Sequence, residues 1–225
     1  MVIINNAERM ERYCEKYEIH SHFSNWELLE KELVRYSKGE FIVPYGERSD
    51  KLIILVSGSV KFSCIADNYE EYFFFNARNE GLFGEVEYVM DIPSITQSEV
   101  LEESECILIP IQRNRSLLDQ DLKFQRFLTH VLAQKYNDMR RNYVDVVSFG
   151  LEERFARYLL SRNEEELRDL KQVSAAIRCS YRQLLRIIKK FCENGYLERQ
   201  EQKGKYRITD LEAIKHVIKK ENESR

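Results

Sequence analysis

Residues 178–191 read RCSYRQLLRIIKKF, a basic stretch inside a chain of 225 residues whose net charge is −3. No acidic residue interrupts its five bases, which are Arg178, Arg182, Arg186, Lys189 and Lys190. Ser180 is followed three residues later by Gln183, the capping-box pattern that begins a helix. The helix would stop near Asn194-Gly195, because glycine readily adopts the left-handed conformation that ends helices. The stretch therefore predicts a basic helix over about 180–194.

The two faces of this helix differ in character. On a 3.6-residue wheel one face is apolar and should pack in a core; it holds Leu184, Ile187, Ile188 and Phe191. Arg182, Leu185 and Arg186 lie opposite, where they can enter the major groove of DNA and arginine can donate two hydrogen bonds to guanine. Lys189 and Lys190 are better placed for phosphates. The alternative is a merely solvated face, but charge of a single sign favours DNA binding.

The segments on either side complete a winged helix-turn-helix. LKQVSAAI at 170–177 predicts a short helix, with small Ala175 and Ala176 where a neighbouring helix must approach closely. Downstream, YLERQ and KYRITD flank a turn at 202–204 and predict a β-hairpin, to which Lys203 and Lys205 give basic character. Such a hairpin is a wing that can lie along the phosphate backbone.

The first half of the chain has a different periodicity. Apolar residues at three- and four-residue spacing, as in EKELVRY at 30–36, predict helices within residues 1–35. From about Tyr36 onward, short β-branched and aromatic runs alternate with turn signals, and five of the eight glycines lie at or near those breaks. SECILIPIQ at 104–112 is the expected last strand. The pattern is typical of a small antiparallel roll, and the chain as a whole is predicted to be α+β.

A long helical stripe follows the roll. Its apolar residues are Phe124, Leu128, Val131, Leu132, Tyr136, Met139 and Tyr143. A helix of about 25–30 residues would span about 40 Å at ~1.5 Å per residue, more than a roll of this size needs to cover itself. We therefore predict that the stripe pairs with the same helix of a second copy. Packing on its own domain is the alternative.

The two halves of the chain differ in net charge. Residues 151–225 hold 18 Lys/Arg and 13 Asp/Glu, a net charge of +5, which leaves −8 for residues 1–150. The basic half is therefore the one expected to meet nucleic acid. No apolar run approaches the roughly 20 residues that cross a bilayer, so no membrane association is predicted. The first residues lack the pattern of a secretion signal, and the five cysteines are scattered, so a cytoplasmic location is expected.

Several motifs in this order resemble those of the Crp/Fnr (cyclic AMP receptor/fumarate–nitrate regulator) family of bacterial transcription factors. They are KGE at 38–40, the PYGE turn, LVSGSVKF at 55–62, GLFGE at 81–85 and SYRQLLRIIKKFCENGYLE at 180–198. Within the family the chain looks most like the YeiL-type branch, judged by GEVEYV and CSYRQLL. The resemblance implies a jelly-roll sensor domain of the cyclic-nucleotide-binding type over 1–112, a dimerisation helix over 113–148 and a DNA-binding domain over 149–225.

The resemblance also implies partners and contacts. A homodimer would bind double-stranded DNA at a two-fold symmetric operator with half-sites about 34 Å apart, and RNA polymerase is a further candidate partner. Family members commonly read the operator at the position of Tyr181. The DNA-binding residues predicted are Ser180, Tyr181, Arg182, Leu185, Arg186, Lys189, Lys190, Lys203 and Lys205. Position 182 is often glutamate in the family and position 178 often glycine, so both the operator and the turn should differ here.

The sensor domain departs from the cyclic-nucleotide binders. By resemblance the effector pocket would include Gly84, Glu85, Ile95 and Thr96, but the family's phosphate-gripping arginine is replaced by Ile95. No Lys or Arg occurs from Asn79 to Gln112, a window with eight acids. An anion there would be repelled, so cyclic AMP is not the expected effector. Glu85 can meet a ribose hydroxyl, or it can be a structural carboxylate in a turn.

The sequence gives less support to other classes of function. His20-Ser21-His22 is the only close histidine pair and no third ligand follows at a defensible spacing, so neither a metal site nor a catalytic residue or cofactor is predicted. Cys14 alone lies near the N-terminus, which argues against an iron–sulfur cluster. Cys64 and Cys106 fall in expected strands and should be buried. The alternatives left open are a thiol redox sensor using Cys14 or Cys179, and a ligand-binding module without DNA function.

Overall fold

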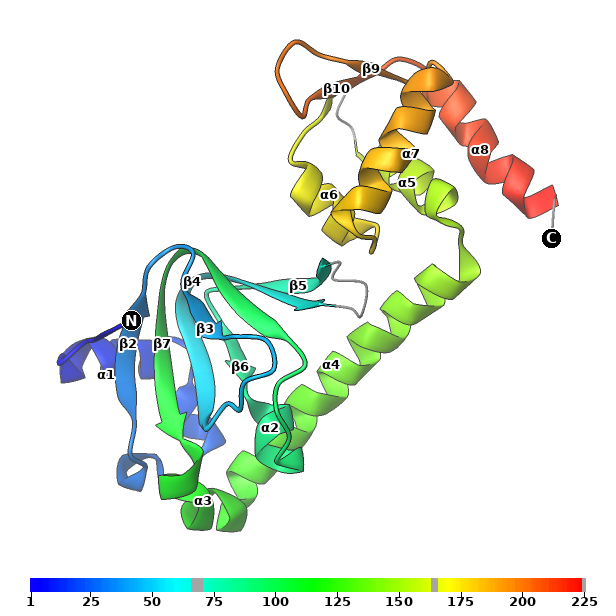
Figure 1. The fold of residues 1–225 in the computed structure, drawn as a ribbon. Coiled ribbons are helices and arrows are strands. Elements are labelled where there is room, and N and C mark those ends of the chain that lie inside the picture. The colour runs from blue at the N-terminus through cyan, green and yellow to red at the C-terminus, as the bar shows by residue number, and fades with distance from the viewer. Residues whose placement is uncertain (66–70, 163–165, 224–225) are drawn as a thin grey trace. The chain divides into compact units, whose positions relative to one another are not determined.

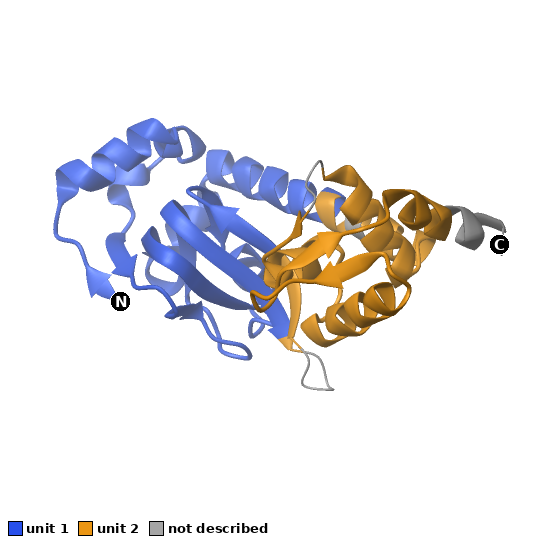
Figure 2. Cartoon of the chain, turned by 90° about the horizontal axis from the view of Figure 1, so that it is seen from above, with its two compact units in different colours: residues 1–64, 75–137 blue, residues 65–74, 138–225 orange. Residues whose placement is uncertain are grey.

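The structure is a computed structural model that describes residues 1–65, 71–162 and 166–223. The chain divides into two compact units (Figure 2), one of residues 1–64 and 75–137 and the other of residues 65–74 and 138–225. The first is built on an antiparallel sheet, whereas the second is mostly helical (Figure 1). The chain is thus α+β, as predicted.

The sheet of the first unit has seven strands in the order β1-β2-β7-β4-β5, with β3 paired to β7 and β6 to β4. The strands are β1 (Val2–Ile3), β2 (Glu32–Tyr36), β3 (Phe41–Val43), β4 (Lys51–Ile65), β5 (Glu71–Arg78), β6 (Gly81–Phe83) and β7 (Gln97–Pro110). Side chains alternate between the two faces of a strand, and β4 serves a separate core on each face. Ile54 and Val56 join one core while Ile53 and Leu55 join the other, which is why β4 is almost continuously apolar.

Helices cover one of those cores. They are α1 (Ala7–Lys16), the short 3₁₀ helices η1 (Ile19–His22) and η2 (Trp26–Leu28), α3 (Ile111–Gln120) and the start of α4 (Leu122–Ser148), while α2 (Glu85–Met90) follows β6. The prediction of helices throughout residues 1–35 is wrong at β1 and β2. In β2, Leu33 pairs with Ile107 of β7, and the backbone pairing overrides the helix-like spacing of EKELVRY. The expected last strand lies within β7.

The long helix starts later than expected. It begins at Leu122 rather than near 113, because Asp121 interrupts the chain between α3 and α4. The Asp121 carboxylate accepts hydrogen bonds from the amides of Lys123 and Phe124, at 3.0 and 3.2 Å, and so caps α4. It also accepts from the amide and hydroxyl of Ser24, at 2.6 and 2.8 Å. One carboxylate therefore both starts α4 and fastens it to the N-terminal segment.

The second unit combines helices with a small three-stranded sheet. Its described elements are the last turns of α4, then α5 (Leu151–Ser161), β8 (Glu166–Leu167), α6 (Leu170–Ala176), α7 (Tyr181–Glu193), β9 (Leu197–Arg199), β10 (Tyr206–Ile208) and α8 (Leu211–Glu223). Phe155 and Phe191 meet edge to face in its core, with ring centroids 4.9 Å apart. The helix-turn-helix and its hairpin were predicted; β8 and α8 were not. None of the described helices is long and apolar enough to cross a membrane.

Candidate nucleic-acid interface

The capping box predicted for the basic helix is present at the start of α7. The Ser180 hydroxyl accepts from the Gln183 amide at 3.2 Å, and the Gln183 side-chain oxygen accepts from the Ser180 amide at 3.0 Å. Ser180 is itself buried. Its hydroxyl therefore fixes where α7 begins.

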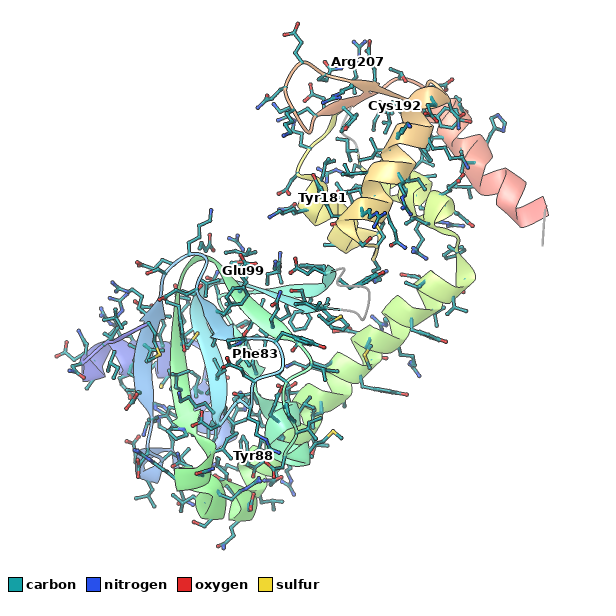
Figure 3. All side chains as sticks on the ribbon, viewed as in Figure 1. Phe83, Tyr88, Glu99, Tyr181, Cys192 and Arg207 are labelled. Atoms are coloured by element: carbon teal, nitrogen blue, oxygen red, sulfur yellow. The ribbon has the colours of Figure 1, made fainter. Side chains whose placement is uncertain are left out.

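The two faces of α7 are those expected from the wheel. Leu184, Ile187, Ile188 and Phe191 are all buried in the core of the second unit. On the other side Tyr181 and Leu185 are 45% and 41% exposed, and Arg182, Arg186 and Lys189 are exposed as well. Figure 3 marks Tyr181 near the start of α7 and Cys192 near its end. One face anchors the helix, so the other is presented to solvent in a fixed orientation.

The two lysines of α7 are already engaged in ion pairs. Lys189 lies 3.7 Å from Glu193, four residues along the same helix. Lys190 pairs closely with Glu152 of α5. Both pairs are solvent-exposed and therefore weak, so either ammonium can exchange its carboxylate for a stronger anion.

The turn before α7 is shaped by a non-glycine residue in a left-handed conformation. Arg178 has φ 54°, and its guanidinium donates to Asp145 at 3.0 Å. Arg154 supports the same turn by donating to the carbonyl of Ile177 at 3.0 Å. The expectation that both alanines of α6 mark the closest helix approach is wrong in part. Ala176 is exposed, and the buried small residue of α6 is Ser174.

The hairpin after α7 has the form of a wing. Tyr206 and Ile208 of β10 pair with Arg199 and Leu197 of β9, and β10 also pairs with β8 on its other edge. Gly204 takes φ 82° in the connecting turn. Lys203 is exposed and Lys205 half-buried. The third strand explains how so short a hairpin holds its shape.

The four effector-pocket residues predicted by resemblance differ in burial and in their contacts. Gly84 has φ 82°, and a Cβ there would lie 2.3 Å from the Lys51 carbonyl oxygen, so the glycine is structurally required. Glu85 is buried, and its carboxylate accepts from the Lys135 ammonium of α4 at 2.7 Å. Ile95, by contrast, is 69% exposed, and Thr96 interacts with Ser94.

Lys135 is bound on several sides. Its ammonium also donates to the carbonyl of Leu82 at 2.8 Å and lies 4.9 Å from the ring centroid of Phe83, which Figure 3 labels. Glu85 thus acts as the structural carboxylate foreseen as one alternative, although its partner is a lysine. Sequence reasoning missed Lys135 because it lies 50 residues away in the chain.

The apolar stripe of α4 is divided. Phe124 and Leu128 are buried in the core of their own unit, so the prediction that they face a second copy is wrong. Val131 and Leu132 are half-buried against the same core. The later residues are free of it: Tyr136, Met139 and Tyr143 are 63%, 57% and 67% exposed.

The cysteines are in poor environments for redox sensing. Burial raises the pKa of Cys14 to about 11 and that of Cys179 to about 11. Cys106 is fully buried as predicted, and burial raises its pKa to about 12; Cys64 is only half-buried. Since the thiolate is the reactive species, neither Cys14 nor Cys179 has the character of a redox-sensing thiol, and that alternative loses its support.

Comparison with known proteins agrees with this architecture. Residues 33–121 match the cyclic nucleotide-binding domain family. The regulatory protein YeiL of Escherichia coli O157:H7 is 28% identical over 174 residues, covering 73% of this chain and 76% of that protein.

Solved structures extend the similarity to the full architecture. A transcriptional regulator of the CRP/FNR family from Thermus thermophilus has a TM-score of 0.57 at 20% identity, covering 84% of this chain and 98% of its own. The c-di-GMP-responsive global regulator CLP of Xanthomonas campestris has a TM-score of 0.65 at 16% identity, covering 89% and 99%. Residues 33–121 are therefore similar to the cyclic nucleotide-binding domain family, and the chain shares its fold with these solved regulators.

Proposed function

We propose that this chain is a cytoplasmic, homodimeric transcription regulator that binds a specific, two-fold symmetric DNA site through α7. The observation that carries the proposal is the exposed face of α7, where Arg182, Leu185 and Arg186 stand on a helix whose opposite face is buried. A helix held in this way can enter the major groove in one orientation. RNA polymerase is the expected downstream partner.

The side chains of this face would have distinct roles. Arg182 and Arg186 would each donate two hydrogen bonds to a guanine, and Leu185 would contact a thymine methyl group. Lys189, Lys190 and the wing lysines Lys203 and Lys205 would bind phosphates, which position the protein without reading sequence. Tyr181, at the exposed start of the helix, would contact DNA beside them.

Dimerisation would use the exposed part of the α4 stripe. Tyr136, Met139 and Tyr143 recur at three- and four-residue spacing on one side of the helix, and large exposed apolar patches commonly mark association surfaces. Two copies paired along this stripe would present two α7 helices, as a two-fold symmetric operator requires.

Cyclic AMP is not the effector we propose. The carboxylate that could meet a ribose hydroxyl, Glu85, is bonded to Lys135, and Ile95 stands where the family resemblance places the phosphate-gripping arginine. A small molecule would act on this domain only through different affinities for the two states of the dimer.

Selection of bound duplexes from a random pool, followed by binding at several salt concentrations, tests the proposal. We expect an enriched palindromic sequence and a linear fall of log affinity with log salt. Binding that shows no enrichment and no salt slope would contradict it and would favour a ligand-binding module without DNA function.

A further inference from the structure

Three side chains with metal-binding atoms meet in the N-terminal segment of the first unit. Glu11 and Cys14 lie three residues apart on α1, and His20 lies in η1. One carboxylate oxygen, one sulfur and one ring nitrogen all lie within 4.8 Å of one another. Oxygen, nitrogen and sulfur ligands together are the set that zinc and related divalent transition metals accept.

The backbone brings His20 back onto α1 through a strained residue. Glu18 has φ 51°, a left-handed conformation that a glutamate rarely adopts. Ser21 holds the turn because its hydroxyl donates to the Glu18 carbonyl at 2.7 Å. Strain of this kind persists only where the surrounding structure enforces it, so the placement of His20 over α1 is a specific feature of the fold.

The imidazole of His20 has an unsatisfied atom on the side of the cluster. Its Nε2 is buried and has no hydrogen-bond partner among the described residues. The nearest carboxylate oxygen of Glu11 is 3.5 Å away, which is too long for a good hydrogen bond. A buried polar atom without a partner is destabilising, and a metal ion between the three side chains would supply the missing partner.

The Cys14 side chain is fully buried, and its sulfur lies inside the cluster beside the Glu11 carboxylate. A thiol binds a metal ion as the thiolate, so binding would release the thiol proton. The positive charge of the ion would also relieve the repulsion between the thiolate and Glu11.

We propose that Glu11, Cys14 and His20 form a binding site for a divalent transition metal ion such as zinc. Structural zinc sites usually have four protein ligands, whereas three leave a position for water or another exchangeable group. The site is therefore of the open kind. Trp26 forms one wall, with its ring 5.9 Å from that of His20.

Titration with cobalt(II) alone tests the site in the full chain after treatment with a chelator. We expect one equivalent to bind and to produce the sulfur-to-metal charge-transfer absorption of a cobalt thiolate. Cys14→Ala and His20→Gln should abolish this absorption. Glu11→Gln, at a half-exposed side chain, should weaken binding by about tenfold or more. Zinc should raise the unfolding temperature of the unmodified chain but not that of Cys14→Ala.

Cys192→Ala and His130→Gln are matched controls, because they remove one thiol and one imidazole outside the cluster and should leave the titration unchanged. Absence of a charge-transfer band at one equivalent would overturn the proposal, as would a band that survives in Cys14→Ala. If Cys14→Ala and His20→Gln do not fold, Glu11→Gln is the deciding variant. Unchanged affinity of Glu11→Gln for cobalt(II) would also contradict the proposal.

Discussion

The ammonium of Lys135 lies 2.7 Å from the carboxylate of Glu85, and this ion pair joins α4 to the start of α2 within the first unit. Glu85 is buried, whereas the Lys135 side chain is about one-third exposed. Removing the lysine would leave a buried carboxylate without its partner, which is more destabilising than removing both charges together.

Lys135→Met should accordingly lower the free energy of unfolding by about 1.5–3 kcal/mol, toward the lower value because the lysine is partly solvated. Urea unfolding at neutral pH measures the change. The double variant Lys135→Met/Glu85→Gln should regain part of the loss, and Lys123→Met, at an exposed position of α4, should change stability by less than about 0.5 kcal/mol. Equal losses in the single and double variants would show that the pair is not coupled.

Arg186→Ala should lower affinity for the selected DNA site by about 1–3 kcal/mol and relax the preference at one position of each half-site. The reason is that the variant removes the guanidinium that we propose donates to a guanine edge, while the core face of α7 is untouched. Competition binding against random duplex measures the specific part. Lys215→Ala, which removes an exposed base from α8, is the matched control. A variant that loses the same affinity on both DNAs would assign Arg186 to phosphate contact.

Met139→Glu should weaken dimerisation, because it places a charge on the exposed apolar side of α4. Val144→Glu is the matched control: Val144 is 54% exposed on the same helix but lies away from the stripe, so its variant should still dimerise. Sedimentation equilibrium distinguishes the two. Unchanged dimers in Met139→Glu, or equal dissociation in both variants, would remove the stripe from the interface.

Asp121 should make stability depend on pH. Burial raises its pKa, but hydrogen bonds from Ser24, Phe124 and Lys123 outweigh burial and hold the pKa below its usual value. A lowered folded-state pKa contributes stability above the unfolded value of about 3.9, and that stability is lost as pH falls through the folded value. Asp121→Asn should therefore be less stable than the unmodified chain at pH 7, and its free energy of unfolding should fall less steeply as the pH is lowered. Denaturant unfolding at several pH values measures both. If the free energies of the two proteins fell in parallel, Asp121 would not be the source of the pH dependence.

The helix-turn-helix could be predicted because its signals lie close together in the sequence. The first unit was harder to predict because it depends on contacts between residues far apart in the chain. Ser180, Gln183 and the apolar face of α7 lie within one short stretch, so the cap and the buried face could be read directly. The helix predicted for residues 30–36 is wrong, because Leu33 of β2 pairs with Ile107 of β7 and no local pattern reveals that pairing.

Contacts between distant residues also determine the Glu85–Lys135 pair and the cluster on α1 and η1 in the first unit. Glu85 could be singled out, but its partner Lys135 comes from a different element. The cluster of Glu11, Cys14 and His20 depends on the left-handed backbone of Glu18, a conformation that composition and spacing do not predict for glutamate.

The backbone conformation of Arg178 has a consequence for how the sequence of this chain can diversify. Its left-handed backbone, with φ 54°, is of the kind that costs a residue with a side chain roughly 1–2 kcal/mol, yet its guanidinium fastens the turn to Asp145 near the end of α4. A glycine would relax the backbone and release that fastening. A single inherited change at this position can therefore adjust how tightly the helix-turn-helix is tied to α4, while every side chain on the exposed face of α7 stays the same.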